Sequence, residues 1–190
     1  MKKYLSLFMV LLFAVALSVM AQDDLPGVDD LETDEWNVIE PGGDTVCSND
    51  TPFSFFARPS SAESDNLMIY LQGGGACWFG DICDLSVNPT YDPFVDESDI
   101  PGPGGIFDFA NEENPFADYD MVFIPYCTGD VHIGNSETTY ESSAGEVTIQ
   151  HNGFNNVSAV LDWTFANYDA PETIFVAGSS AGSIPAPFYA

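Results

Sequence analysis

The sequence predicts an α/β domain with a mostly parallel sheet. Three short apolar runs, 67–71, 121–125 and 173–177, are expected to be strands. The first two are continuous apolar segments of the kind found where both faces of a sheet are covered, so we expect them to be buried. Residues 154–168, between the second and third runs, have helical periodicity. The order strand, loop, strand, helix, strand is typical of α/β proteins.

The remaining segments are expected to be an edge and connecting loops. Residues 36–39 and 52–57 are predicted to be short strands of an antiparallel edge. Residues 80–118 are rich in Asp, Pro, Gly and Asn and lack sustained periodicity, so we expect a long loop with one short helix. A loop of that length in a compact domain is usually a lid or a binding wall. Residues 127–143 are also expected to be loop.

The helix over 154–168 is expected to bury one stripe of side chains. The apolar positions at i, i+3, i+4 and i+8 are Val157, Val160, Leu161 and Phe165. Asn152 is placed to cap the start of this helix. A second helix is expected from Ala181 onward.

The first 21 residues have the pattern of an export signal. Lys2 and Lys3 precede an apolar core, and Val19-Met20-Ala21 has the small residues of a cleavage site. The alternative is a membrane anchor, but the apolar run is short for a span and polar residues follow it at once. No other segment is apolar enough to cross a membrane, so we expect a secreted or periplasmic protein.

The chain is strongly acidic, with 30 Asp and Glu against 3 Lys and Arg and a formal net charge of −27. Loss of Lys2 and Lys3 with the signal would lower this charge by two units and leave Arg58 as the one certain cation. Such a surface excludes nucleic acid as a partner, because phosphate binding depends on Lys and Arg. It favours a secreted protein from a salty habitat over an acidic binding function.

Residues 22–35 are expected to form a flexible acidic lead-in, and residues 36–190 to form one folded domain. Hydrophobic residues make up 45% of the chain. That content supplies a core of ordinary size, so the acidic composition does not predict disorder.

Four cysteines, an even number in an exported chain, predict two disulfides. They are Cys47, Cys77, Cys83 and Cys127, and three pairings are possible. The six-residue spacing of Cys77 and Cys83 suits a small closed loop and would leave Cys47 with Cys127. A zinc site is the alternative, but it lacks C-x-x-C spacing and nearby histidines. No metal or cofactor is expected.

The third apolar run leads directly into Gly178-Ser179-Ser180-Ala181-Gly182, a G-x-S-x-G sequence. In the nucleophile elbow, a strand, this sequence and a helix form a tight turn that presents the central serine above the sheet. Glycines are needed because no Cβ fits where the strand and helix backbones meet. Ser180 is therefore the candidate nucleophile.

A serine nucleophile also needs backbone N–H groups aimed at the developing negative oxygen. The residue after the nucleophile, Ala181, supplies one. Gly73-Gly74-Gly75 follows the first buried strand, where hydrolases with this elbow place their other donors. Three glycines alone can be a flexible turn, but with the downstream elbow they predict a single site.

Ser180 has no good base in this sequence. A serine hydroxyl is activated by an adjacent base, normally a histidine held by a carboxylate. The two histidines, His132 and His151, both precede Ser180, whereas sites with this elbow have the order Ser, acid, His. We expect each histidine to hydrogen-bond a loop backbone instead.

Three segments resemble the pectin acetylesterase/Notum family, which are secreted α/β-hydrolase serine esterases. They are Leu-Gln-Gly-Gly-Gly-Ala-Cys-Trp at 71–78, Ile-Pro-Tyr-Cys-Thr-Gly-Asp-Val-His-Ile-Gly at 124–134, and Phe-Val-Ala-Gly-Ser-Ser-Ala-Gly at 175–182. The resemblance extends from about Cys47 to Ala190. The Ile-Pro-Tyr-Cys block is its specific part, since a bare G-x-S-x-G is common to many hydrolases.

The resemblance implies roles for individual residues. Ser180 would be the nucleophile, and the oxyanion-hole amides would be those of Gly74, Gly75 and Ala181. The implied disulfides are Cys77–Cys83 and Cys47–Cys127. The family's Asp and His have no counterpart in the 190 residues, so residues 36–190 would be the N-terminal portion of an α/β-hydrolase-like domain, truncated after the nucleophile elbow.

The resemblance also implies a function, the extracellular hydrolysis of carboxylic esters through an acyl-enzyme. The substrate would be an O-acylated polysaccharide or another short acyl ester. Family members often carry Trp within or directly after the glycine run. Here Ala76 occupies that place and Trp78 follows the cysteine, so the pocket shape and the acyl preference are expected to differ.

The 190 residues alone are expected to be inactive without the triad Asp and His. A sheet cut at its elbow strand should expose an apolar edge, so we expect the isolated segment to aggregate or stay partly unfolded, and the complete protein to be a monomer. One alternative is a non-catalytic glycan- or lipid-binding relative. Another is a lipase- or cutinase-like esterase, which would share the elbow but lack the Ile-Pro-Tyr-Cys block.

Overall fold

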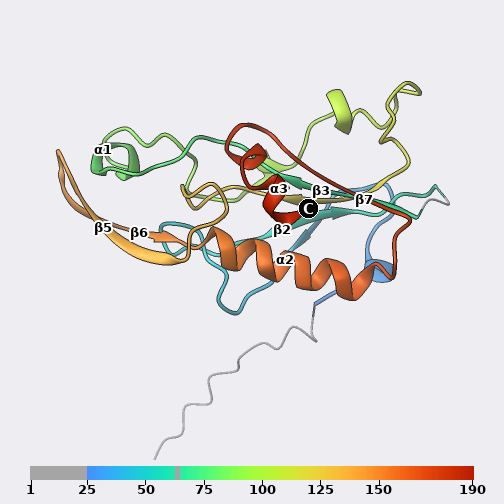
Figure 1. Cartoon of the computed structure of the whole chain (residues 1–190), viewed down its shortest axis with the longest axis horizontal. Helices are drawn as coiled ribbons and strands as arrows, with labels where there is room; N and C mark the ends of the chain where they lie inside the picture. Colours follow the sequence, from blue (N-terminus) through green and yellow to red (C-terminus); the bar gives the residue numbers. More distant parts are fainter. Residues whose placement is uncertain (1–24, 63–64) are drawn as a thin grey trace, which may run out of the picture.

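A five-stranded sheet with one long helix on its face forms the body of the molecule in the computed structural model, which describes residues 25–62 and 65–190 (Figure 1). The strand order is β1-β2-β4-β3-β7. The strands are β1 (Asn37–Ile39), β2 (Phe55–Arg58), β3 (Asn66–Leu71), β4 (Asp120–Ile124) and β7 (Thr173–Gly178). β3 pairs in parallel with β4 and β7, while β2 pairs antiparallel with β1 and β4. Only β2 therefore runs against the other four, and the predicted α/β sheet with an antiparallel edge is confirmed.

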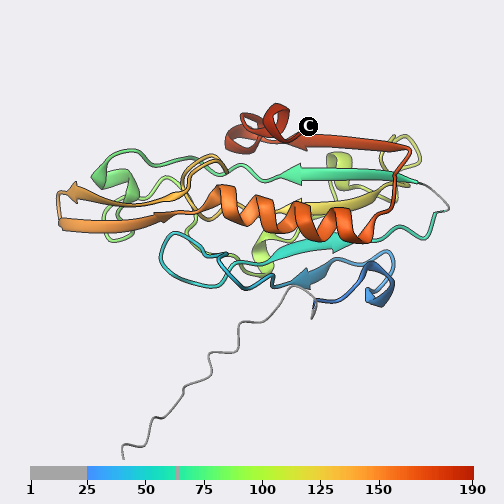
Figure 2. The same cartoon turned by 60° about the horizontal axis from the view of Figure 1, so that its bottom comes forward.

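The helix α2 (Gly153–Asn167) crosses one face of this sheet (Figure 2). Alternate residues of the central strands point toward it, so Leu67, Ile69 and Leu71 of β3 share one core with Val157 and Val160 of α2. The opposite face is covered by the long loop before β4. There Phe107 lies 5.0 Å from the Tyr70 ring and 5.8 Å from the Phe123 ring. β3 and β4 are buried on both faces, as their apolar runs predicted.

The buried stripe of α2 differs from the predicted one at its end. Val157 and Val160 are fully buried, but Phe165 is 56% exposed and Thr164 is buried in its place. Each helical residue turns by about 100°, so Thr164 lies about 20° from Val157 around the axis and Phe165 about 80° away. The prediction for Phe165 was therefore wrong.

The start of α2 is capped by a residue from another part of the chain. Asn152 holds the N-cap position but makes no side-chain capping bond, and its Nδ2 donates instead to the Asp44 carbonyl at 2.8 Å. The first helical amide, Gly153 N–H, donates to Asp130 Oδ2 at 2.7 Å. The predicted Asn152 cap is thus replaced by a carboxylate from the loop after β4, which binds one of the unpaired N–H groups of a helix start.

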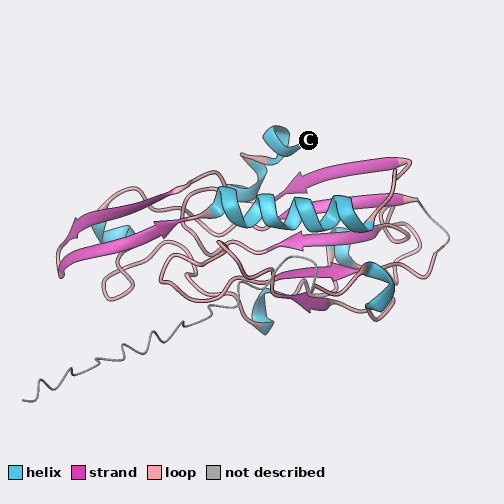
Figure 3. Ribbon diagram, turned by 90° about the horizontal axis from the view of Figure 1, so that it is seen from below, coloured by secondary structure: helices cyan, strands magenta, loops and turns pink. Residues whose placement is uncertain are grey.

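The loop predicted at 127–143 was partly wrong, because it contains a strand. β5 (Ser136–Ser142) and β6 (Gly145–His151) form an antiparallel hairpin that extends beyond the carboxyl ends of the parallel strands (Figure 3). β5 has no apolar run and was missed for that reason; its half-buried residues alternate with exposed ones, as Thr138 and Tyr140 do. The short helix α1 (Gly80–Cys83) packs against it, and Ser143 N–H donates to Asp81 Oδ1 at 2.6 Å.

The segment after the elbow is helical, but it is not one continuous helix. A 3₁₀ turn at Ser180–Ser183 is followed by the short α3 (Ala186–Tyr189). Pro185 separates them, since proline has no N–H to continue the hydrogen-bonded ladder. The helix predicted from Ala181 is therefore divided in two. Further 3₁₀ turns lie at Val28–Asp30, Glu97–Asp99 and Gly105–Phe107.

The acidic lead-in is attached to α2 in the part that the structure describes. Val28 N–H donates to Asn167 Oδ1 at 3.0 Å, and the Trp163 indole N–H donates to the Pro26 carbonyl at 2.9 Å. These two bonds attach Pro26 and Val28 to the last turns of α2. The predicted export signal, residues 1–21, lies outside the described residues. Within residues 25–62 and 65–190, no helix has the length and apolarity to span a bilayer.

Candidate active site at the carboxyl ends of β3 and β7

Two neighbouring parallel strands end together and bring the elbow beside the glycine run. Leu71, the last residue of β3, is in register with Gly178, the last residue of β7. Parallel strands present their carboxyl ends at the same edge of a sheet, where ligand sites of α/β proteins form. The two motifs are 106 positions apart in the chain, measured from Gly73 to Ser179, yet they are hydrogen-bonded to each other.

Ser180 has the strained backbone of a nucleophile elbow. Its φ is 46°, in the left-handed region that non-glycine residues rarely adopt, and its side chain is exposed. A Cβ on Gly178 would overlap the Gly182 carbonyl, and a Cβ on Gly182 would overlap the Leu71 carbonyl. Both glycines are thus required by the close approach of strand and turn. The Gly182 N–H donates to the Ser179 carbonyl at 2.8 Å and closes the turn.

The glycine run lies directly against this turn. Gly73 N–H donates to Ser179 Oγ at 3.1 Å, and a Cβ on Gly73 would overlap the Ser179 carbonyl. Gly74 and Gly75 have φ values of 154° and 88°, which a residue with a side chain would adopt only with strain. A Cβ on Gly75 would also overlap the Thr90 carbonyl. The run is therefore a fixed backbone loop built for close packing.

Three backbone N–H groups at this edge have no protein acceptor among the described residues. They belong to Gly74, Gly75 and Ala181. Ala181 is free because the first bond of its 3₁₀ turn is made by the next residue, Gly182. Unpaired amides beside an exposed serine are the donors that an oxyanion requires.

A pocket of about 390 Å³ opens at Ser180. Its lining residues are Gly75, Ala76, Trp78, Val131, Ser180, Ala181 and Ile184. The walls are mainly apolar, and Trp78 and Ile184 at its rim are 69% and 65% exposed. Gly74 lies outside this pocket and lines a neighbouring hollow of about 460 Å³ with residues 89–94. The structure thus brings Ser180, Gly75 and Ala181 into one pocket, whereas Gly74 lines a different hollow.

Both histidines are engaged away from Ser180. His132 is 1% exposed, and its Nε2 lies 2.8 Å from the Gln72 carbonyl. His151 Nδ1 lies 2.9 Å from the Thr128 carbonyl, and its Nε2 lies 2.8 Å from Tyr140 Oη. The prediction that each histidine bonds a loop backbone is confirmed. Neither is hydrogen-bonded to Ser180 in the described part of the chain.

Comparison with known proteins assigns the family. A family model described as Pectinacetylesterase matches residues 37–190, most of the chain. The chain belongs to the pectinacetylesterase family.

Relatives of this pectinacetylesterase-family chain include palmitoleoyl-protein carboxylesterases. NOTUM of Schmidtea mediterranea is 32% identical over 145 residues, which cover 73% of this chain and 26% of that protein. The notum1 protein of Xenopus laevis is 28% identical over 176 residues, covering 90% of this chain and 35% of that protein. An inactive palmitoleoyl-protein carboxylesterase, notum1b of Danio rerio, is 30% identical over 98 residues, 50% of this chain and 69% of that protein. The chain thus spans a minor part of the length of the first two.

The two disulfides of the pectinacetylesterase-family chain have the predicted pairing. Cys47–Cys127 ties the segment before β2 to the loop after β4, with the Cα atoms 5.2 Å apart. Cys77–Cys83 closes the segment after the glycine run, with the Cα atoms 5.0 Å apart. All four cysteines are bonded, so none is left for the alternative zinc site. The second disulfide packs in the same small core as Ala181.

Sequence reasoning missed several residues that shape this site. Val131, with a φ of 52°, lines the Ser180 pocket from the loop after β4. Thr90 Oγ1 donates to the Ala76 carbonyl at 2.5 Å and holds the long loop against the glycine run. Gln72 Oε1 accepts the Tyr126 N–H at 2.8 Å. Only Gln72 carried a signal in the sequence, as a polar residue between a buried strand and three glycines.

Proposed function

We propose that the whole protein is an extracellular carboxylic ester hydrolase that uses Ser180 as its nucleophile. One observation carries the proposal: Ser180 has a strained, exposed elbow conformation and lines one pocket with Gly75 and Ala181, whose backbone N–H groups have no acceptor among the described residues. The family match supports ester hydrolysis as the reaction class. The substrate would be an O-acylated polysaccharide or another short acyl ester.

In this proposal Ser180 and three backbone amides carry out the formation of the acyl-enzyme. Ser180 Oγ would attack the ester carbonyl, and the carbonyl oxygen would become negative. The N–H groups of Gly74, Gly75 and Ala181 would stabilise that oxygen, which is the largest single contribution in many acyl-transfer enzymes. Collapse would expel the alcohol, which would take up the proton that the general base removed from Ser180, and would leave an acyl-enzyme that water would then hydrolyse.

The general base would come from outside the residues given. A serine hydroxyl needs an adjacent base to react, and His132 and His151 both have other partners. We propose that the whole protein adds a histidine and a carboxylate to Ser180, and that residues 1–190 alone do not turn over substrate.

Hydrolysis of p-nitrophenyl acetate tests this proposal. In the whole protein, Ser180→Ala should lower kcat by about 10⁶-fold, as loss of a serine nucleophile does elsewhere. Ser179→Ala is the comparison at the same turn; it removes only the acceptor for the Gly73 N–H, so it should cost no more than about 100-fold, far less than loss of the nucleophile. Retention of full activity by Ser180→Ala, or Ser180-dependent turnover by residues 1–190 alone, would contradict the proposal. Release of acetate from O-acetylated polysaccharide would identify the substrate class.

Export is part of the same proposal. Two disulfides fit an oxidising compartment, and residues 1–21 have the pattern of a signal. N-terminal sequencing of the secreted protein should begin at Gln22. A protein retained in the cytoplasm with free thiols would contradict export.

A second candidate is a non-catalytic protein that holds glycan or lipid at the same pocket. It is supported by the lack of a base at Ser180 in the described residues, and by the existence of an inactive relative. Under this alternative, Ser180→Ala would leave ligand binding unchanged and the whole protein would show no ester turnover.

A further inference from the structure

We propose that His132 is a positioning residue for the oxyanion hole, because it holds the peptide group that leads into the glycine run. The inference rests on the proposed function and concerns a histidine that the mechanism above does not use.

The peptide bond between Gln72 and Gly73 is held at both ends. Its carbonyl oxygen lies 2.8 Å from His132 Nε2, and its N–H donates to Ser179 Oγ at 3.1 Å. A peptide group is planar, so two such bonds fix its orientation as a unit. The direction of the next amides, those of Gly74 and Gly75, depends on that orientation. These glycines have few steric limits of their own, so their order must come from neighbours.

The contact with the Gln72 carbonyl and the burial of the ring set the tautomer and the charge of the His132 imidazole. A carbonyl oxygen only accepts, so Nε2 must carry the hydrogen and donate. Burial lowers the pKa of His132, which keeps the ring neutral near neutral pH. A neutral imidazole with its hydrogen on Nε2 is therefore a fixed donor. This hydrogen-bonding role differs from that of a catalytic base.

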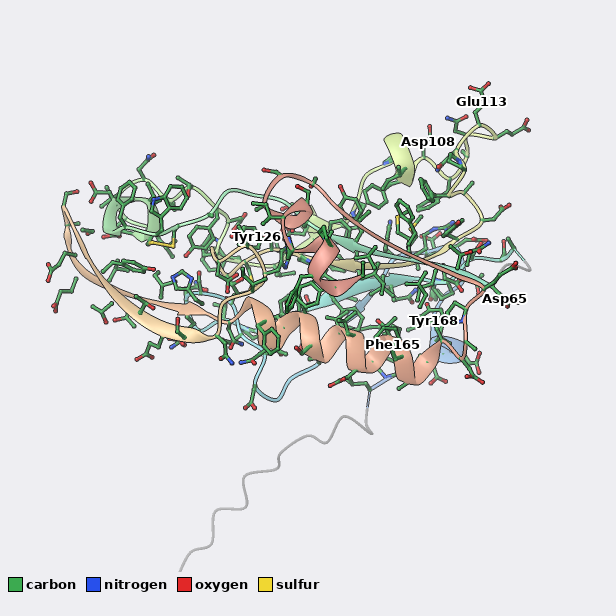
Figure 4. The ribbon with its side chains drawn as sticks, viewed as in Figure 1. Asp65, Asp108, Glu113, Tyr126, Phe165 and Tyr168 are labelled. Carbon is green, nitrogen blue, oxygen red and sulfur yellow. A yellow bond between two sulfur atoms is a disulfide. The ribbon has the colours of Figure 1, made fainter. Side chains whose placement is uncertain are left out.

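His132 is itself held firmly enough to act in this way. Its φ is 60°, a strained value for a residue with a side chain. Asp130 Oδ1 accepts its N–H at 3.1 Å, and its carbonyl accepts the Tyr189 hydroxyl at 2.7 Å. The ring packs 4.7 Å from that of Tyr126, which lies at this end of the sheet (Figure 4). Tyr189 belongs to α3, directly after the elbow.

These contacts make one connected unit. Asp130 also binds Gly153 N–H at the start of α2, so the His132 loop is tied to that helix. His132 is thus connected to α2 through Asp130, to the segment after the elbow through Tyr189, and to the glycine run through the Gln72 carbonyl. A buried imidazole needs an acceptor in any role, but here the acceptor is the carbonyl of the peptide group that leads into the three glycines.

Substitution of His132 in the whole protein tests the proposal. His132→Leu keeps an apolar side chain but removes the donor, and His132→Gln keeps an N–H that can reach the Gln72 carbonyl. We expect His132→Leu to lower kcat for p-nitrophenyl acetate by about 10- to 100-fold, less than the 10²- to 10³-fold typical of losing an oxyanion donor itself. KM should change by less than about twofold, since only transition-state binding is affected. His132→Gln should restore most of kcat.

Amide hydrogen exchange gives a readout that does not depend on activity. His132→Leu should speed exchange within residues 72–76 at the hydrogen-bonded amides of Gln72 and Gly73 by at least about tenfold, with His132→Gln close to the parent. His151→Leu is the matched control, because that buried histidine bonds Thr128 and Tyr140 away from the glycine run. It should leave exchange in residues 72–76 unchanged.

Three outcomes would overturn the proposal. They are equal kcat losses in the Gln and Leu variants, a kcat loss without faster exchange in residues 72–76, and an equal kcat loss in His151→Leu. If His132→Leu does not fold, His132→Gln decides alone, since a kcat loss of 100-fold in a folded Gln variant contradicts the donor role. If the whole protein proves to have no esterase activity, the exchange measurement still tests the peptide clamp, so the two failures are distinguishable.

Discussion

β3 and β7 lie side by side, run in the same direction and both end at the candidate site, yet they differ greatly in burial. Leu67 of β3 is 1% exposed, whereas Ile174, its partner in register on β7, is 43% exposed. β3 has paired strands on both sides and covers on both faces. β7 is an edge strand in the described part of the chain. In the described residues the glycine run thus follows a strand that is paired on both sides, and the elbow follows an edge strand.

The difference shows which half of the site holds the other in place. The elbow is attached to β3 through backbone contacts: the Ser179 N–H donates to the Leu71 carbonyl at 3.2 Å, and Ser179 Oγ accepts from Gly73. In the described residues, the geometry of Ser180 therefore depends on β3 and on the loop that follows it. Other apolar side chains near the elbow are also exposed, namely Phe175, Ile184 and Phe188.

The largest expected effect comes from truncating the two paired side chains. Leu67→Ala should lower the free energy of unfolding by about 2–5 kcal/mol, because it removes buried methyl groups and leaves a cavity. Ile174→Ala should cost less than about 1 kcal/mol, since the side chain is already in contact with water. Urea unfolding followed by tryptophan fluorescence measures both. If both variants lose the same free energy of unfolding in the whole protein, then β7 is covered there and the two strands do not differ in burial.

A smaller effect is expected where the two strands touch at the site. In Gly182→Ala the new methyl group would meet the Leu71 carbonyl carbon at 2.6 Å and the Gln72 carbonyl oxygen at 2.7 Å, so backbone must move. Such overpacking costs about 1–3 kcal/mol. Gly104→Ala is the control, because its backbone is extended and nothing lies within 4 Å of the added methyl. Thermal unfolding compares the two, and similar midpoints would show that β3 and the elbow are not tightly packed.

The contrast between the two strands also marks what sequence could predict. The apolar runs of β3, β4 and β7 identify them as strands, and the order of motifs places the ends of β3 and β7 at one edge. The adjacency of Ser180 and Gly75 followed from that rule. The exposure of Ile174 agrees with the apolar edge expected at the elbow strand.

Contacts made by polar side chains across the fold could not be predicted. β5 was missed because its sequence, Ser-Glu-Thr-Thr-Tyr-Glu-Ser, has no apolar face that a periodicity search would detect. The Asp130 cap of α2 and the His132 contact with Gln72 join segments that lie far apart in the chain. Such bonds depend on loop conformations, including positive φ at Val131 and His132, which local propensity does not reveal. The acyl preference could not be predicted from the sequence either, because the Ser180 pocket is lined by residues of such loops, including Val131.

The smallest expected effect lies at the amino ends of the same strands, opposite the site. Asp120 begins β4 in register with Leu67, and its Oδ1 accepts the Ser60 N–H at 2.7 Å. This end of the molecule also carries Asp65 and Tyr168 (Figure 4). Burial raises the pKa of Asp120 above its usual 3.8, with Asp65 adding to the rise and the Ser60 amide and Arg58 opposing it.

The sign of the Asp120 effect follows from proton linkage. A raised pKa means that the folded protein binds this proton more tightly than the unfolded chain, so the carboxyl favours folding below about pH 4. That contribution is lost as pH rises through the folded-state pKa. Asp120→Asn keeps an acceptor for Ser60 and should gain stability relative to the parent between pH 4 and 7, by less than about 1 kcal/mol because the group is partly exposed. Asp120→Ala lacks the acceptor and should be destabilised by about 1 kcal/mol. Urea unfolding at several pH values measures these differences. An Asn variant that loses stability relative to the parent as pH rises would contradict the prediction, because it would show that burial of the Asp120 carboxylate does not destabilise the folded protein.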